Sequence, residues 1–217
     1  MNKETTTNNV KQIGKPDGPT AYFILDRNQK PTLKQRLHKW RYNIRKAWAA
    51  KTIKADPHTL DEVCEYIKAK HGFAEVTQDT KEYQEEYREM RASFLMINAP
   101  ELLGELKDLP QLKGRSEEDI KRHIAAIDER KQVAFQVPKE LFDIELHMFK
   151  KQAGNNKFHI SVEKRYPYIG GGAGGSARTV HRMDKIMKDI YRYYGVTKED
   201  IENKSKRYEE LLRTLAR

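Results

Sequence analysis

The sequence predicts an α+β fold that is mostly helical, with a small antiparallel sheet that includes a hairpin near residues 142–165. Apolar residues recur at spacings of three and four over most of the chain, which is typical of amphipathic helices. Strict alternation of apolar and polar residues is confined to short runs, which predicts few strands. The order of strand, helices, hairpin and helices then favours an α+β fold in which helix dominates.

The composition is that of a folded protein. Of the 217 residues, 37% are hydrophobic and 34% are charged, which is apolar enough for one core. We expect a flexible N-terminal segment over residues 1–16 and a single domain over residues 17–217. The polar N-terminus lacks the hydrophobic stretch of a secretion signal, and no apolar run approaches the roughly 18 residues of a membrane span. With its single cysteine, Cys64, expected to be buried, the chain is predicted to be a soluble cytoplasmic protein without membrane insertion.

The first half of the chain is predicted to contain one short strand and several helices. Asp17-Gly18-Pro19-Thr20 forms a turn before a strand over residues 21–25. Thr59 and Glu62 form a capping box for a helix that ends at Gly72. The other predicted elements are a basic helix from residue 33 to about 51, a short strand over 73–76, a helix over 83–97, a short helix over 100–106 and a helix capped by Ser116 and Asp119.

The second half is predicted to open with a β-hairpin. Its strands are Phe142 to Lys150 and Lys157 to Arg165, joined around Gly154-Asn155-Asn156. A glycine-rich loop over residues 170–175 follows and leads into a helix that ends at Gly195. A last helix is expected from Thr197 to about residue 215.

A basic segment carries the whole net charge of +10. Residues 27–55 contain ten lysines and arginines and no aspartate or glutamate, and the rest of the chain is balanced. Cations interleaved with Trp40, Tyr42 and Trp48 are typical of surfaces that bind single-stranded nucleic acid, because cations contact phosphates and aromatic rings stack on bases. The predicted polyanion-binding residues are Lys34, Arg36, Lys39, Arg41, Arg45 and Lys46. Nucleic acid is the preferred partner and an acidic protein the second choice.

Other interpretations of this segment remain open. Trp40 and Trp48 share one helix face with Leu37 and Ile44, which predicts that both tryptophans lie in the core and that the cations form a solvated face. A helix on a membrane surface is disfavoured because its apolar face is expected to pack against the protein. A helical interaction or scaffold protein whose charge serves solubility is a further alternative.

The glycine-rich segment is a second candidate site. Gly170, Gly172 and Gly175 satisfy G-x-G-x-x-G, but neither a preceding parallel strand nor a P-loop lysine accompanies them. The start of the following helix is predicted to hold one anion through its free N–H groups. The residues of this anion-binding loop are Gly172, Gly174, Gly175, Ser176 and Arg178, and a flexible connector is the alternative.

The hairpin offers a third candidate. If its turn centres near Ala153, His147 lies opposite His159, with Glu145 and Glu163 on the same polar face. Such a group suits metal binding or acid–base chemistry. The alternative function is therefore a small enzyme with an acid–base or anion site between the glycine-rich loop and the hairpin. We expect neither a metal site nor a cofactor.

Two stretches resemble known proteins. Ile13-Gly14 followed by Asp17-Gly18-Pro19-Thr20 resembles the G-G-x-D-G-P-T motif of the β subunit of sodium-pumping carboxylate decarboxylases. In those membrane-embedded pumps the aspartate takes part in sodium translocation, a role not expected of Asp17 in a chain without membrane spans. The residues from Asp17 to Ile24 and from Tyr193 to Tyr208 are similar to a group of small soluble bacterial proteins that carry the D-G-P-T motif. This resemblance implies a bacterial cytoplasmic setting and no particular mechanism.

Overall fold

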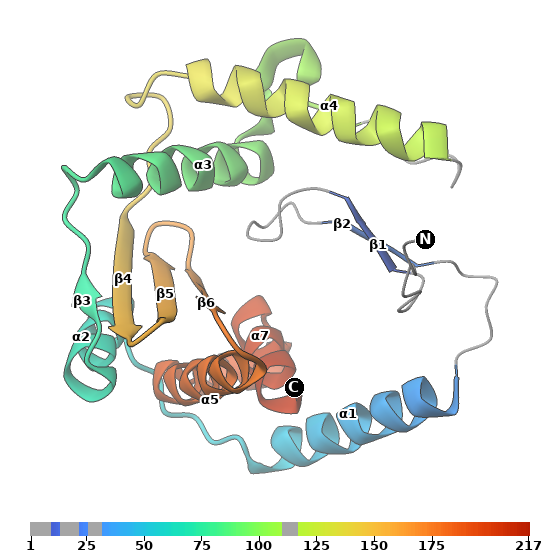
Figure 1. Ribbon diagram of the computed structural model, residues 1–217, viewed down its shortest axis with the longest axis vertical. Helices are drawn as coiled ribbons and strands as arrows, with labels where there is room; N and C mark the ends of the chain where they lie inside the picture. Colours follow the sequence, from blue (N-terminus) through green and yellow to red (C-terminus); the bar gives the residue numbers. More distant parts are fainter. Residues whose placement is uncertain (1–9, 14–21, 26–31, 110–116) are drawn as a thin grey trace, which may run out of the picture.

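The computed structural model describes residues 10–13, 22–25, 32–109 and 117–217. The predicted class is confirmed, because the chain forms a mostly helical α+β fold (Figure 1). A four-stranded antiparallel sheet has the order β3-β4-β5-β6, and a separate antiparallel pair is formed by β1 and β2. The strands are β1 Val10–Ile13, β2 Tyr22–Leu25, β3 Ala74–Glu75, β4 Leu146–Ala153, β5 Asn156–Glu163 and β6 Tyr168–Gly174.

Most predicted helices are present, with small differences at their ends. The helices are α1 Leu33–Thr52, α2 Leu60–His71, α3 Lys81–Asn98, the 3₁₀ helix η1 Pro100–Leu106, α4 Glu117–Gln136, α5 Ala177–Tyr194, α6 Lys198–Asn203 and α7 Lys206–Ala216. The predicted last helix is divided into α6 and α7. Lys204 adopts a left-handed conformation with φ 50°, and Ser205 starts α7 by accepting a hydrogen bond from the Tyr208 N–H.

The first and last residues of α2 are determined by neighbouring residues, as the sequence predicted. Thr59 accepts a hydrogen bond from the N–H of Glu62, and the Glu62 carboxylate accepts one from the N–H of Thr59, so the predicted capping box is confirmed. Gly72 ends the helix with φ 64°, a conformation that other residues adopt reluctantly.

Two buried clusters lie on the two sides of the sheet. In β4, Leu146 and Met148 pack with α3, α4 and η1, whereas the adjacent Phe149 packs with α2, α5 and α7. This division follows from strand geometry, since successive side chains point to opposite faces. The sheet therefore holds two groups of helices apart (Figure 1).

The hairpin is confirmed, but the predicted register is wrong. The turn consists of Gly154 and Asn155, and the first turn residue has φ 59°. His147 consequently pairs with Val162, and His159 pairs with Lys150. Because paired residues share a face and neighbours alternate, His147 and His159 lie on opposite faces of the sheet.

The predicted glycine-rich loop is mostly a strand. Residues 168–174 form β6, which pairs with β5 at the edge of the sheet. Neighbouring side chains occupy the space above its glycines: a Cβ on Gly172 would lie 2.6 Å from the His159 ring, and one on Gly170 would lie 2.2 Å from the Tyr168 hydroxyl. At Gly171 a Cβ would lie 2.8 Å from the main-chain oxygen of His159, so the close approach of β5 requires glycine at that position, although glycine normally disfavours strands.

The N-terminal predictions are only partly within the described residues. The predicted strand is confirmed as β2, and its partner β1 comes from the segment expected to be flexible. The remaining residues of that segment lie outside the described part of the chain, as do those of the D-G-P-T motif.

Candidate functional site

The basic helix α1 is oriented differently from the prediction. Ala49 is buried in the core cluster that includes Leu211 and Leu212 of α7. Trp40 is 59% exposed and Trp48 is 66% exposed, so the expectation that both tryptophans lie in the core is wrong. The exposed apolar residues form one stripe along the helix, and they are Leu33, Leu37, Trp40, Ile44 and Trp48.

All six predicted polyanion-binding cations of α1 are exposed. The helical repeat places Lys34, Arg41 and Arg45 on one side of the apolar stripe and the other three on its second side. Among the described residues, no aspartate or glutamate carboxylate lies within ion-pair distance of any of them. The helix itself contains no acidic residue. The cations are therefore not neutralised by the described part of the protein.

The C-terminal end of α1 is held against the body of the protein. Arg45 Nη1 donates to the main-chain oxygen of Arg217 at 2.6 Å. After the helix, the Asp56 N–H donates to the Val196 oxygen at 3.1 Å and the His58 N–H to the Tyr194 oxygen at 3.0 Å. These contacts attach one end of α1, while the rest of the helix extends away from the sheet (Figure 1).

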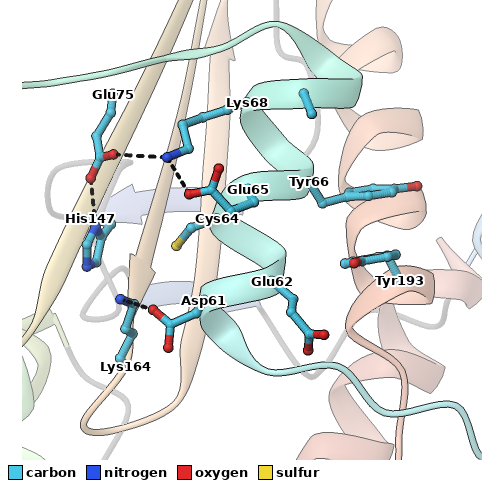
Figure 2. Close-up of a pocket in the computed structure, with 11 residues that line it drawn as sticks. Asp61, Glu62, Cys64, Glu65, Tyr66, Lys68, Glu75, His147, Lys164 and Tyr193 are labelled. Carbon is cyan, nitrogen blue, oxygen red and sulfur yellow. Dashed lines mark hydrogen bonds and ion pairs between the residues drawn. The ribbon is translucent and has the colours of Figure 1, made fainter.

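A second candidate site is a groove of about 580 Å³ between α2 and strands β3 and β4. Figure 2 shows Cys64 pointing from α2 toward the strands, where Glu75 and His147 face it. On the other side of α2, Tyr66 stacks on Tyr193 of α5 with ring centroids 3.8 Å apart. Side chains from α2, β3, β4 and α5 therefore line this groove.

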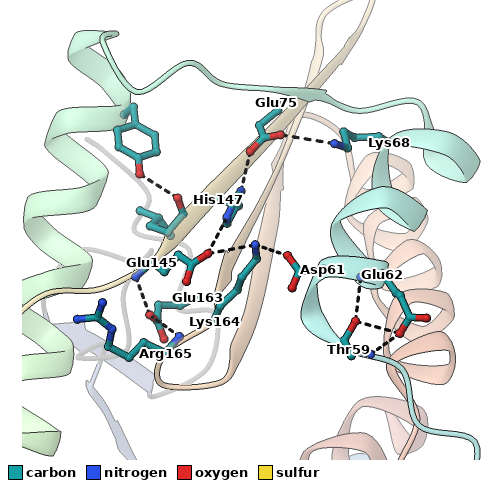
Figure 3. A network of polar contacts seen from close by, with 12 residues as sticks. Thr59, Asp61, Glu62, Lys68, Glu75, Glu145, His147, Glu163, Lys164 and Arg165 are labelled. Carbon is teal, nitrogen blue, oxygen red and sulfur yellow. Dashed lines mark hydrogen bonds and ion pairs between the residues drawn. The ribbon is translucent and has the colours of Figure 1, made fainter.

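Charged groups in this groove form a connected network (Figure 3). His147 Nδ1 lies 2.7 Å from Glu75 Oε1, and its Nε2 lies 3.7 Å from Glu145 Oε1. Lys164 Nζ joins Glu145 at 3.2 Å to Asp61 at 2.5 Å. Each carboxylate of the network therefore already has a cationic or imidazole partner.

Pairing and burial fix the protonation states of two groups in the groove, Asp61 and Cys64. The hydrogen bond from Lys164, together with its charge, lowers the pKa of Asp61, which stays ionised. Burial raises the pKa of the Cys64 thiol to about 11, against weaker opposing effects of nearby lysines. Because the thiolate is the reactive form, Cys64 is a buried, inert thiol, as the sequence predicted.

The acid–base group predicted on the hairpin is not brought together. His147 faces the groove, while His159 lies on the opposite face of the sheet. Glu163 is fully buried, and its carboxylate accepts main-chain N–H bonds from Glu145 at 2.9 Å, from Arg165 at 3.0 Å and from Tyr166. Glu163 therefore stabilises the turn after β5. The carboxylate nearest to His147 belongs to Glu75, which is outside the predicted group.

The predicted anion-binding loop is also rearranged. Gly172 and Gly174 belong to β6, and Ser176 caps α5 by accepting a hydrogen bond from the Thr179 N–H at 3.4 Å. Arg178 is exposed. A cavity of about 340 Å³ does lie over β6, but α5 and α7 line it and neither hairpin histidine does. This cavity therefore does not join the glycine-rich segment to the hairpin histidines, as the predicted enzyme site requires.

Sequence reasoning missed the residues that join distant parts of the chain. Glu75, Asp61 and Lys164 were not singled out, because nothing in their local pattern shows that they meet in the groove. The same is true of Arg192 of α5, which lines a cavity with Arg45 and Trp48 of α1, and of Lys188, on which the charge of Arg45 acts. The only local signal was that Lys188 and Arg192 stand four residues apart on a predicted helix.

No known protein family matches the chain, and neither a curated protein nor a solved structure is similar enough to be matched. Within the described ranges, no helix combines the length and apolar character needed to cross a bilayer. The functional interpretation therefore depends on the geometry of the two candidate sites.

Proposed function

We propose that α1 binds a polyanion and that single-stranded nucleic acid is its partner. The observation that carries this proposal is the exposure of Trp40 and Trp48 beside cations that no described carboxylate neutralises. Large exposed apolar side chains gathered on one surface of a folded protein commonly mark a binding site. The high density of positive charge restricts that site to anionic partners.

The arrangement of α1 suits a chain of phosphates and bases. Cations on both sides of the stripe contact phosphates, and each contact releases counterions. The indole rings stand eight residues apart, which corresponds to about 12 Å along a helix. Two rings at that separation provide stacking surfaces for two bases, whatever their identity. Binding of this kind is expected to depend strongly on salt and weakly on sequence.

A second candidate partner is an acidic protein. Leu33, Leu37 and Ile44 are exposed in the same stripe, and aliphatic side chains contribute little to base stacking. An amphipathic helix presents such a stripe when it docks into an apolar groove of another protein. Carboxylates at the edge of that groove would contact the cations beside the stripe.

Fluorescence anisotropy of a labelled oligonucleotide, measured with the full chain, tests the proposal. For about five phosphate contacts to a single strand, the association constant falls roughly a hundred-fold between about 50 and about 200 mM salt. A poly-glutamate peptide and anionic phosphatidylserine vesicles serve as competitors.

The competitors separate the partner classes. Salt-dependent binding of the oligonucleotide, with little displacement by the peptide or the vesicles at equal charge, supports nucleic acid. Binding of the vesicles or the peptide without binding of the oligonucleotide contradicts the nucleic-acid proposal. Oligonucleotide binding that does not change with salt would show that the cations of α1 are not the contact surface.

A further inference from the structure

Helices α1 and α5 both contact α7 (Figure 1). Four basic side chains from these three parts of the chain lie close enough that the charges of Arg45, Arg192 and Arg217 act on Lys188. We call Arg45, Lys188, Arg192 and Arg217 the cation cluster. Arg45 Nη1 is bonded to the main-chain oxygen of Arg217 at 2.6 Å, which brings α1 to the end of α7. Lys188 and Arg192 are four residues apart in α5 and therefore share one side of that helix.

The cation cluster borders two cavities. Arg45 and Arg192 line a cavity of about 430 Å³, together with Trp48 of the exposed stripe. Lys188 and Arg217 line the cavity of about 340 Å³ over β6. The first cavity connects the cluster to the proposed binding surface of α1, because Trp48 and Arg45 belong to both.

Few carboxylates compensate this positive charge. No aspartate or glutamate carboxylate lies within ion-pair distance of any of the four side chains in the part of the chain that the structure describes. Asp184 acts on Lys188 through its charge only. Asp56 lines the cavity of about 430 Å³ without pairing with Arg45 or Arg192. Asp184 and Glu210 line the cavity of about 340 Å³, and Glu210 Oε1 lies 4.0 Å from Arg213 Nη2.

The gathered cations repel one another. Burial lowers the pKa of Lys188, and the charges of Arg45, Arg192 and Arg217 lower it further, against the opposing effect of Asp184. A lower pKa means that the charged form of Lys188 is less favoured in the folded protein than in an exposed lysine. An anion bound among these side chains would remove the repulsion and stabilise the protein.

We infer that the cation cluster binds a phosphate group and anchors the polyanion whose other phosphates lie along α1. This inference rests on the function proposed for α1. Arginine suits phosphate because its planar guanidinium donates two parallel hydrogen bonds to phosphate oxygens. A terminal phosphate carries up to two negative charges, whereas a phosphodiester carries one, so a cluster of four cations favours a strand with a terminal phosphate.

Two variants that each remove two positive charges test the inference. Lys188→Met with Arg192→Met removes half of the cluster. Lys198→Met with Lys206→Met is the control, since both lysines are exposed at the starts of α6 and α7. The probes are inorganic phosphate, an oligonucleotide with a 5′-phosphate and the same oligonucleotide with a 5′-hydroxyl.

The wild-type protein and the control are expected to bind the 5′-phosphorylated strand about tenfold or more tightly than the hydroxyl form, and phosphate is expected to raise their melting temperature. The cluster variant is expected to lose both effects. Its melting temperature in phosphate-free buffer is expected to be higher than that of the wild type, which also shows that it folds.

The outcomes separate this inference from the proposal on which it rests. Equal binding of both strands by the wild type and the cluster variant overturns the anchor and leaves the α1 proposal standing. Binding of inorganic phosphate with no binding of either strand overturns the α1 proposal and the anchor together. A cluster variant that is less stable than the wild type contradicts the repulsion among the four cations.

Discussion

Ala49 is 2% exposed, whereas its neighbour Trp48 is 66% exposed. The helix α1 thus turns its small residue toward α7 and its large apolar residues outward. Packing through alanine allows the close approach that the bond from Arg45 to Arg217 requires. The same orientation leaves the stripe and its cations together on the outside, which is the basis of the proposed function.

Replacing either tryptophan should separate binding from stability. Trp40→Ala and Trp48→Ala should each change the free energy of unfolding by less than about 0.5 kcal/mol, because both side chains are largely exposed. Each should weaken oligonucleotide binding by about 1–3 kcal/mol through loss of stacking. Chemical denaturation and anisotropy measure the two effects.

Leu33→Ala is the matched control, because Leu33 lies in the stripe without an aromatic ring and is 83% exposed. It should leave nucleic-acid binding unchanged. Equal losses for Leu33→Ala and the tryptophan variants would favour an acidic protein with an apolar groove instead.

Gly195 should be essential for stability. It has φ 58°, and a Cβ there would lie 1.9 Å from the main-chain oxygen of Asp56. We expect Gly195→Ala to lower the free energy of unfolding by about 3 kcal/mol or more, because strain and a backbone clash combine. Gly174→Ala is the comparison, since a Cβ there has no neighbour within 4 Å, and its cost should stay below about 1 kcal/mol. Similar losses in urea denaturation would refute this interpretation.

Stability should fall as the pH drops below about 6.5, the ordinary pKa of histidine. Burial lowers the pKa of His71 below 6.5, although Asp189 and its hydrogen bond oppose this effect. The folded protein therefore favours neutral His71, so its contribution is complete above pH 6.5 and is lost as protonation becomes favourable in the unfolded chain. Urea midpoints at about pH 7 and about pH 5 should differ less for His71→Gln than for the wild type. An unchanged difference would mean that other groups control this range.

Cys64 should react with a thiol reagent only after unfolding. Its pKa of about 11 leaves little thiolate near neutral pH, and the side chain is buried. Ellman's reagent at about pH 8 should modify the native protein slowly and the urea-unfolded protein rapidly. Rapid modification of the native protein would show that the groove exposes a reactive thiol.

Local sequence patterns predicted a helix or strand well where residues within that segment determine its ends. The capping box of Thr59 and Glu62 and the terminating Gly72 define α2 within one segment. The hairpin was also found from alternation. The register of the hairpin was predicted wrongly. The turn lies at Gly154 and Asn155 and not at Ala153, and this difference changes every cross-strand pair.

The strand β6 and the orientation of α1 depend on contacts between distant parts of the chain, which local sequence patterns do not show. The glycines of β6 have low strand propensity, and the strand forms because β5 pairs with it while the rings of His159 and Tyr168 cover its glycines. The apolar stripe of α1 was visible in the sequence, but its periodicity could not show which side faces the protein. Docking through Ala49 against α7 determines that orientation.

The central claim is that the cations of α1 form an open, unneutralised surface that holds a polyanion. Its most direct test is the affinity of an oligonucleotide for the triple variant Arg36→Glu, Lys39→Glu and Arg41→Glu, which leaves the Arg45 contact with Arg217 intact. The control carries Lys185→Glu, Lys198→Glu and Lys206→Glu, an equal change of charge on exposed positions outside α1. We predict that the affinity falls roughly a hundred-fold or more in the α1 variant, with melting temperature unchanged, and only a few-fold in the control. Equal losses of affinity in the two variants would contradict the claim, because binding would then depend on net charge and not on α1.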